Sequence, residues 1–198
     1  MIDPDRITNF SRTDDELEEF ILFCAAVAGH NAHTTAKALE SFLSKQAAYQ
    51  TPFQYIISCL AEGVMLDVLL ASHRFGCYRK LAKAFAELSL SGLNLRTCTP
   101  EELETIHGIG PKTSRFFILH SRPDQNNIAV LDRHILKYLG DLGVSVPKST
   151  PNKKKYKELE RIFVNHAREK GVDIATLDLE IWRQNRTLPS DSNGEVND

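Results

Sequence analysis

A lysine and an aspartate twenty positions apart are the residues best placed to do chemistry in this sequence. Lys112 directly follows the glycine-rich segment 108–111, and Asp132 follows the apolar run Ile128–Leu131. A neutral lysine amine is a good nucleophile, and a carboxylate can stabilise a cationic transition state and assist proton movement. Because a solvated lysine, with a pKa of about 10.4, is almost wholly protonated at neutral pH, its environment must favour the neutral amine.

The residues before Lys112 predict a sharp turn between two short helices. The segment Thr99–Glu102 combines an N-cap, a proline at the first helical position and an acid three residues after the cap, so a helix starts there and ends near Ile106. The glycines that follow stop this helix, and Pro111 suits the start of a second one running to about His120.

The start of that second helix is a candidate phosphate site. Its first N–H groups have no partner within the helix and lie at the positive end of the helix dipole, so they can bind a phosphate whatever the base sequence. An ordinary turn between helices would also use glycine. The apolar residues that flank the turn favour a DNA-binding hairpin, and they are Leu103, Ile106, Ile109, Phe117 and Ile118.

The rest of the chain shows helical periodicity, and no region has several alternating strands joined by hairpin turns. Asp132 stands at the N-cap position of a helix over Arg133–Leu142, a role that does not exclude catalysis. The sequence therefore predicts an all-α protein. The other expected helical segments are Asp14–Gly29, His33–Ala48, Phe53–Leu70 with a possible break at Gly63, Tyr78–Leu90, Lys154–Lys170 and Ile174–Gln184.

The charge distribution is compatible with DNA binding. Residues 1–19 carry −5 and residues 187–198 carry −3 of a total of −2, so residues 20–186 carry +6. The sequence contains no long uncharged apolar stretch that could span a membrane. The acidic N-terminus lacks the apolar core of a signal peptide, which indicates an intracellular protein. Four widely spaced cysteines predict reduced, mostly buried thiols and no clustered metal site, and we expect no cofactor.

Two motifs together resemble the endonuclease III superfamily of helix-hairpin-helix DNA glycosylases. Residues 106–112 match its hydrophobic-x-Gly-hydrophobic-Gly-x-Lys pattern, with His107 where many members have proline. Residues 129–135 resemble the segment that carries the family's essential aspartate. The usual C-terminal four-cysteine iron–sulfur loop is missing, and the segments 131–135 and 177–182 are more similar to the compact archaeal-type 8-oxoguanine glycosylases.

This resemblance implies one glycosylase domain over residues 1–186, with two helical lobes, a cleft between them and the hairpin at 99–120. It implies a bifunctional DNA glycosylase/AP lyase that flips out an oxidised purine, most simply 8-oxoguanine. Lys112 would attack the sugar C1′ and form a Schiff base that permits β-elimination, and Asp132 would stabilise the cationic sugar. The hairpin would bind the DNA backbone through Gly108, Ile109, Gly110 and Thr113.

Other residues are candidates by their position relative to the family. Asp178 and Trp182 share a helical face that would help to build the base pocket, Phe116 could line its opposite wall, and His30 or Asn31 could contact a base edge. Core packing is the plainer alternative for Trp182 and Phe116. For His30 and Asn31 it is an ordinary turn between helices, with Asn31 as a helix cap. Two basic stretches could hold the backbone: residues 74–80, with Arg79 and Lys80, and the run Lys148–Lys157.

Two rival functions remain open at this point. The same scaffold could excise another modified base, such as an oxidised pyrimidine, or the chain could be a helix-hairpin-helix DNA-binding module without catalysis. In the favoured interpretation the partner is double-stranded DNA that contains a damaged base, and the protein is a monomer without a membrane partner. It would lie with the nucleoid of a prokaryote or in a eukaryotic nucleus. We expect residues 187–198 to form a disordered acidic tail.

Overall fold

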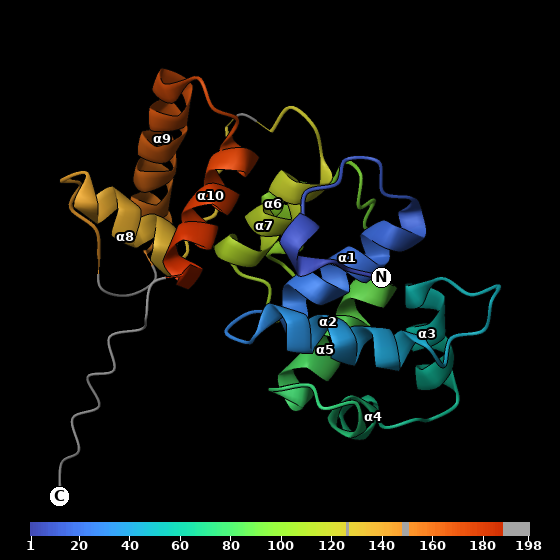
Figure 1. Ribbon diagram of the computed structural model, residues 1–198. Helices are drawn as coiled ribbons and strands as arrows, with labels where there is room; N and C mark the ends of the chain where they lie inside the picture. Colours follow the sequence, from blue (N-terminus) through green and yellow to red (C-terminus); the bar gives the residue numbers. More distant parts are fainter. Residues whose placement is uncertain (126, 148–150, 188–198) are drawn as a thin grey trace, which may run out of the picture. The chain divides into compact units, whose positions relative to one another are not determined.

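The computed structural model describes residues 1–125, 127–147 and 151–187, and every regular element in these residues is helical (Figure 1). The chain forms two compact units, Met1–Gln125 and Asn126–Asp198. The first unit contains η1 (Pro4–Arg6), α1 (Asp14–Ala26), α2 (Ala32–Leu43), α3 (Pro52–Ala61), α4 (Leu66–Ser72), α5 (Tyr78–Leu90), α6 (Pro100–Leu103) and α7 (Pro111–Ser121). The second contains α8 (Arg133–Asp141), α9 (Lys153–Lys170) and α10 (Ile174–Thr187).

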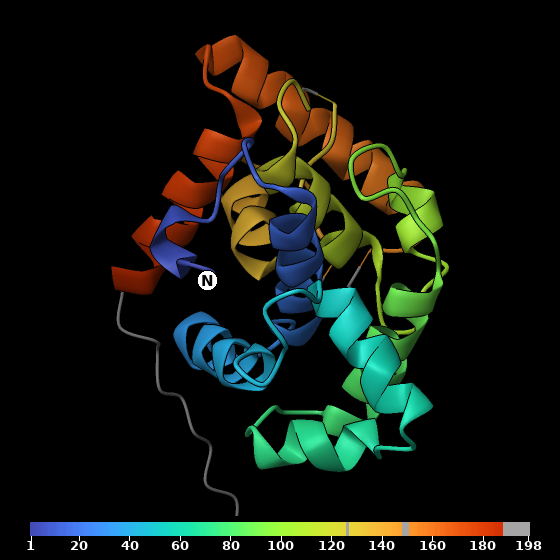
Figure 2. The same ribbon diagram turned by 90° about the vertical axis from the view of Figure 1, so that its right-hand side faces the viewer.

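Helix α1 is the centre of the first unit. It packs against α2, α3, α5 and α7, while α3 and α4 also pack against α5 (Figures 1 and 2). Its buried face carries Phe20, whose ring centroid lies 5.6 Å from that of Phe117 on α7. On the far side of this core, Phe42 of α2 contacts Phe85 of α5 at 6.1 Å. Buried aromatic side chains therefore tie α7 to the rest of the unit.

Local signals in the sequence place most helix ends correctly. Thr99 and Glu102 form the predicted capping box at the start of α6, and Pro111 begins α7. The expected break at Gly63 is also confirmed: the residue has φ of +75° and separates α3 from α4. The predicted segment His33–Ala48 is too long, because α2 ends at Leu43.

The acidic N-terminal segment packs against the rest of the first unit. Arg12 is buried, and its guanidinium donates to the carbonyl oxygens of Ile7 at 2.6 Å and of His120 at 2.8 Å. The same guanidinium lies 3.8 Å from the centroid of the Phe20 ring. His120 accepts a further bond from the Asn9 amide. These contacts connect the segment to the C-terminal end of α7.

The second unit holds the segment before Asp132 by buried polar contacts. The Tyr156 hydroxyl on α9 donates to the Ala129 carbonyl at 3.0 Å and accepts from the Leu131 amide at 3.1 Å. Glu160 accepts from the Ala129 amide at 3.1 Å. The apolar run predicted at residues 128–131 is therefore a buried segment without regular secondary structure, and α9 satisfies backbone groups that no helix or sheet pairs.

The C-terminal helix is longer than predicted, and the cysteines are mostly buried. The last helix, α10, continues to Thr187, three residues beyond the predicted end, and residues 188–198 of the expected tail lie outside the described residues. The four cysteines are free, and three are buried as predicted, while Cys77 is exposed. Among the described residues, no helix is long and apolar enough to cross a membrane.

We predict that Glu18→Gln changes the pH dependence of stability. Glu18 accepts a 2.8 Å hydrogen bond from the Phe53 amide, and burial raises the pKa of its carboxyl. Because the folded-state pKa lies above the unfolded one, the native protein gains stability as pH falls through this pKa and loses it as pH rises. The variant keeps the acceptor oxygen but has no charge to desolvate.

Denaturant unfolding at about pH 4 and about pH 7 provides the test. Relative to the parent protein, Glu18→Gln should be more stable at the higher pH than at the lower pH. An identical difference in the free energy of unfolding at the two pH values would contradict the prediction.

Candidate functional site

The hairpin between α6 and α7 has the geometry that its glycines predict. Gly108 has φ of +80°, a left-handed conformation that favours glycine. Gly110 has an ordinary extended backbone and is the N-cap of α7, without any side-chain cap. The side chain of Ile109 is buried, and its amide donates to the Ile106 carbonyl at 3.1 Å. Ile109 therefore anchors the turn, and its N–H is already used within the hairpin.

The first turn of α7 presents backbone donors and one amine. The amides of Gly108, Gly110 and Thr113 have no hydrogen-bond partner among the residues that the structure describes. No acidic residue lies in this first turn. Lys112, the second residue of the helix, is exposed. Positive dipole, unused amides and a cation therefore meet at one helix end, which is the arrangement that binds phosphate.

Two partly buried carboxylates support the turn, and sequence reasoning missed both. Glu87 of α5 accepts from the His107 amide at 2.6 Å. Glu104, at the end of α6, pairs with the buried Arg115 of α7 at 2.7 Å. The available signal was a charged residue, Arg115, on the face of α7 that also carries Phe117 and Ile118 into the core. A buried arginine requires an acceptor nearby.

Asp132 is a helix cap, as the sequence predicts. Its Oδ1 accepts from the amides of His134 at 2.8 Å and Ile135 at 3.0 Å, at the start of α8. The residue is half-buried. Because the preceding backbone is held by Tyr156, the position and direction of this carboxylate are set from both sides.

The remaining base-pocket candidates differ in their surroundings. On the first unit, Phe116 is half-buried, with its ring 4.8 Å from that of His120. Asn31 caps α2 by accepting from the Thr34 amide at 3.0 Å, which is the plainer of the two roles considered for it. On the second unit, α10 carries Asp178, which is buried, and Trp182, which is half-buried. A base contact by any of these residues remains a prediction.

The structure brings together two stretches that the sequence left separate. The ring of His30 lies against Gly76, where a Cβ atom would come within 2.3 Å of its Cε1. Gly76 belongs to the basic stretch that leads into α5, whose first turn exposes Arg79 and Lys80. The other basic run, Lys148–Lys157, lies partly outside the described residues, and Asn152 caps its helical part.

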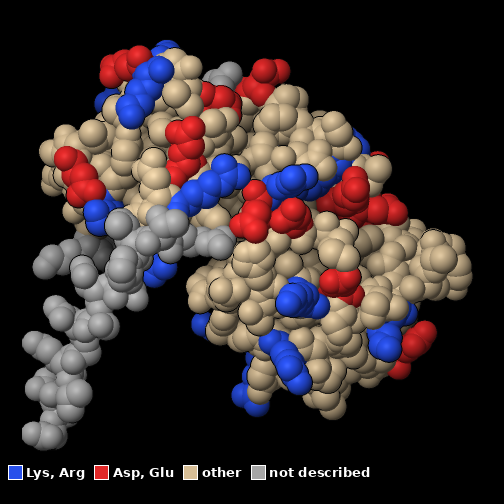
Figure 3. All heavy atoms as spheres, in the orientation of Figure 1, with Lys and Arg blue, Asp and Glu red and all other residues tan. Residues whose placement is uncertain are grey.

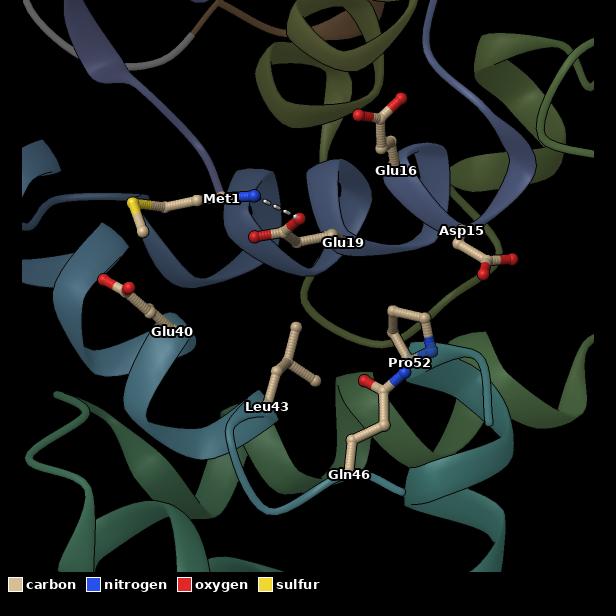
Figure 4. A pocket seen from close by; sticks show the side chains of 8 residues that line it. All are labelled: Met1, Asp15, Glu16, Glu19, Glu40, Leu43, Gln46 and Pro52. Atoms are coloured by element: carbon tan, nitrogen blue, oxygen red, sulfur yellow. Dashed lines mark hydrogen bonds and ion pairs between the residues drawn. The ribbon is translucent and has the colours of Figure 1, made fainter. Parts of the chain in front are cut away.

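Neither the face drawn in Figure 3 nor the cavity drawn in Figure 4 has the charge that a phosphate site needs. On the face drawn in Figure 3, basic and acidic side chains are intermixed. Four of the eight residues that line a cavity of about 270 Å³ on the first unit are carboxylates, among them Glu19, which pairs with the terminal amine of Met1 at 3.1 Å (Figure 4). None of the predicted site residues lines this cavity, and its carboxylates would repel phosphate.

We predict that Gly110→Ser separates stability from DNA binding. Serine is a preferred N-cap residue, so its hydroxyl should accept from an amide of the first turn of α7 and leave stability equal or higher by a few tenths of a kcal/mol. The same hydroxyl would occupy the donor that a phosphate needs. Binding to an undamaged duplex, measured by fluorescence anisotropy, should therefore weaken.

The control for this variant is Gly108→Ala. It forces a side chain into the left-handed conformation and should lower the free energy of unfolding by about 1–2 kcal/mol. Parental DNA affinity in Gly110→Ser would count against a phosphate site at this helix end.

We also predict that the cap and the charge of Asp132 can be separated. Asp132→Ala removes the cap and should lower the free energy of unfolding by about 1 kcal/mol, whereas Asp132→Asn keeps a good cap and should change it by only a few tenths. Urea denaturation of both variants measures the difference. Equal losses would show that the capping bonds contribute little to stability.

Comparison with known proteins identifies the family. The family model described as 8-oxoguanine DNA glycosylase matches residues 4–172. The 8-oxoguanine DNA glycosylase/AP lyase of Sulfurisphaera tokodaii is 29% identical over 161 residues, which cover 75% of this chain and 76% of that protein. The protein of the same name from Korarchaeum cryptofilum is 24% identical over 181 residues, which cover 86% and 80% of the two chains.

Solved structures show the same fold. The Methanocaldococcus jannaschii 8-oxoguanine glycosylase/lyase, crystallised with a 15mer DNA containing 8-oxoguanine, has a TM-score of 0.68 at 23% identity and covers 93% of this chain and 90% of its own. The 8-oxoguanine DNA glycosylase of Thermotoga maritima has a TM-score of 0.67, also at 23% identity, with coverage of 91% and 85%. With a family model that spans most of its length, the chain belongs to the 8-oxoguanine DNA glycosylase family.

Proposed function

We propose that this protein excises 8-oxoguanine from double-stranded DNA and then cleaves the strand, with Lys112 as the nucleophile. The observation that carries the proposal is the exposed lysine at the second position of α7, directly behind a glycine turn with unused amides. The N-terminus of α7 therefore combines backbone donors that can bind a DNA phosphate with an amine next to them. The names of the related proteins, 8-oxoguanine DNA glycosylase/AP lyase, support the same activity.

The chemistry assigned to Lys112 proceeds in two stages. In the first, the amine nitrogen bonds to the sugar C1′ while the glycosidic bond breaks, and the departing base keeps the electron pair and gains a proton. Opening of the sugar ring then leaves an imine between Lys112 and C1′. In the second stage, the imine makes the C2′ proton acidic, and loss of that proton expels the 3′ phosphate by β-elimination.

Asp132 supplies negative charge to the same sugar. As the base departs, positive charge develops on the deoxyribose, and a carboxylate directed at it stabilises the transition state. The capping bonds from His134 and Ile135 fix the Oδ1 atom and thereby the orientation of the carboxylate. The proposal requires Asp132 of the second unit and Lys112 of the first to face one deoxyribose.

The target base must leave the duplex stack before its glycosidic bond can be attacked. We propose that the flipped purine stacks on Trp182 and that Asp178 accepts a hydrogen bond from the purine edge, with Phe116 as a further wall. His30 and the first turn of α5, with Arg79 and Lys80, are proposed to contact the DNA around the gap. We propose that the enzyme works as a monomer on genomic DNA.

Borohydride trapping tests the central step, because it reduces the imine to a stable covalent bond. The parent protein should become attached to a duplex that contains 8-oxoguanine, whereas Lys112→Gln should bind the duplex without becoming attached. Asp132→Asn should be trapped about 10²–10⁴-fold more slowly than the parent. A matched control is Lys170→Gln, at the far end of α9, which should be trapped at the parental rate.

The choice of duplex distinguishes the rival functions. Attachment to 8-oxoguanine but not to an oxidised pyrimidine supports the proposed substrate, and the opposite preference would replace it with another base. A parent protein that binds each duplex yet is never trapped, including on an apurinic site, would be a DNA-binding module without lyase chemistry.

A further inference from the structure

A buried ion pair lies inside the hairpin, beneath the phosphate-binding turn. Nη1 of Arg115 is 2.7 Å from Oε1 of Glu104, and the two side chains are only 7% and 22% exposed. Taking two charges out of water is costly, and apolar side chains of similar volume are often as stable in such places. Stability alone therefore does not explain why this ion pair is present.

Arg115 and the neighbouring Ser114 both reach one backbone atom, the carbonyl oxygen of Pro111. Arg115 Nη1 donates to the carbonyl oxygen of Pro111 at 3.3 Å, and the hydroxyl of Ser114 lies 3.1 Å from the same oxygen. Ser114 also donates to Glu104 Oε1 at 3.1 Å. Because proline has no N–H, this carbonyl is the polar backbone group by which Pro111 can be held.

The orientation of that carbonyl is linked to the position of the Lys112 backbone. The Pro111 carbonyl and the nitrogen and Cα atoms of Lys112 belong to one rigid peptide plane. Side chains on a helix incline toward its N-terminus, and residues three apart are neighbours, so Arg115 reaches back under the turn that carries Lys112. Fixing the plane fixes the origin of the lysine side chain.

We propose that Glu104 and Arg115 are positioning residues for the amine of Lys112. Held by Glu104, the Arg115 guanidinium fixes the Pro111–Lys112 peptide, so that the amine meets C1′ at the distance and angle that bond formation needs. This inference rests on the proposed function. A displacement of about 1 Å in a reacting group is enough to slow a reaction about 10²-fold.

The test is the first-order rate of borohydride trapping on a duplex with an apurinic site, with the protein in saturating excess. Dividing by the final trapped amount removes any effect of a smaller folded fraction. Arg115→Gln should lower this rate constant about 10–10²-fold while shifting the half-saturating protein concentration less than about threefold. Arg115→Lys, which keeps the charge, should recover part of the rate.

Two further variants make the result specific. The double variant Glu104→Gln/Arg115→Met removes both buried charges together, leaves neither unpaired, and should show the same loss of rate. The matched control is Arg122→Gln at the other end of α7, where the guanidinium donates to the carbonyls of Cys98 at 2.7 Å and Leu95 at 2.8 Å. This control should lower the thermal midpoint and keep the parental rate constant.

Each outcome bears on a different statement. If Arg115→Gln and the double variant are trapped at the parental rate, the positioning role is wrong and the proposed function stands. If Arg122→Gln slows trapping as much as Arg115→Gln, any loosening of α7 suffices and the assignment to this pair fails. If the parent protein is never trapped on the apurinic duplex, the proposed function fails, and the inference fails with it.

Discussion

To bind phosphate as proposed, the N-terminus of α7 has to remain uncovered and still be rigid, and several contacts of the first unit meet both conditions. Helices α1, α3 and α6 close their first turns with capping boxes. Helix α7 has Gly110 at its N-cap, no side-chain cap and no acid in its first turn. It therefore lacks about 1 kcal/mol of capping that a phosphate oxygen can supply. Helix α5 also begins without a side-chain cap, and Arg79 and Lys80 lie in its first turn.

Helix α7 is held without an N-terminal side-chain cap by charged side chains that bind backbone groups of the helix and of the turn before it. Glu87 holds the turn at His107, Arg115 holds Pro111, and Arg12 holds the carbonyl of His120 at the other end of the helix. Each contact involves a charged group bound to a backbone N–H or C=O, and such bonds are stronger than neutral ones. Helix α7 is thus fixed along its length by groups that leave its outward N–H donors unoccupied.

The sequence predicts a feature well when the residues that determine it lie close together in the chain, and poorly when they lie far apart. The cap at Asp132, the capping box at Thr99 and the break at Gly63 depend on residues within three or four positions, and all three follow from local chemistry. The bonds of Arg12, Arg115 and Tyr156 join residues 108, 11 and 27 positions apart, so no local pattern predicts them. Ile109 shows the limit within one motif: its N–H was expected to face phosphate, and the turn uses it.

Under the proposed function, each unit holds one reacting group with its own contacts. The first unit holds the Pro111 carbonyl, next to Lys112, through Arg115 and its partner Glu104. The second fixes the Asp132 carboxylate through its bonds to the start of α8 and through Tyr156, which holds the preceding backbone. Neither set of supports lies at the amides that would grip the DNA backbone. Damage to them should therefore affect the orientation of the reacting atoms more than the affinity for DNA, because orientation contributes to rate and the phosphate contacts contribute to binding.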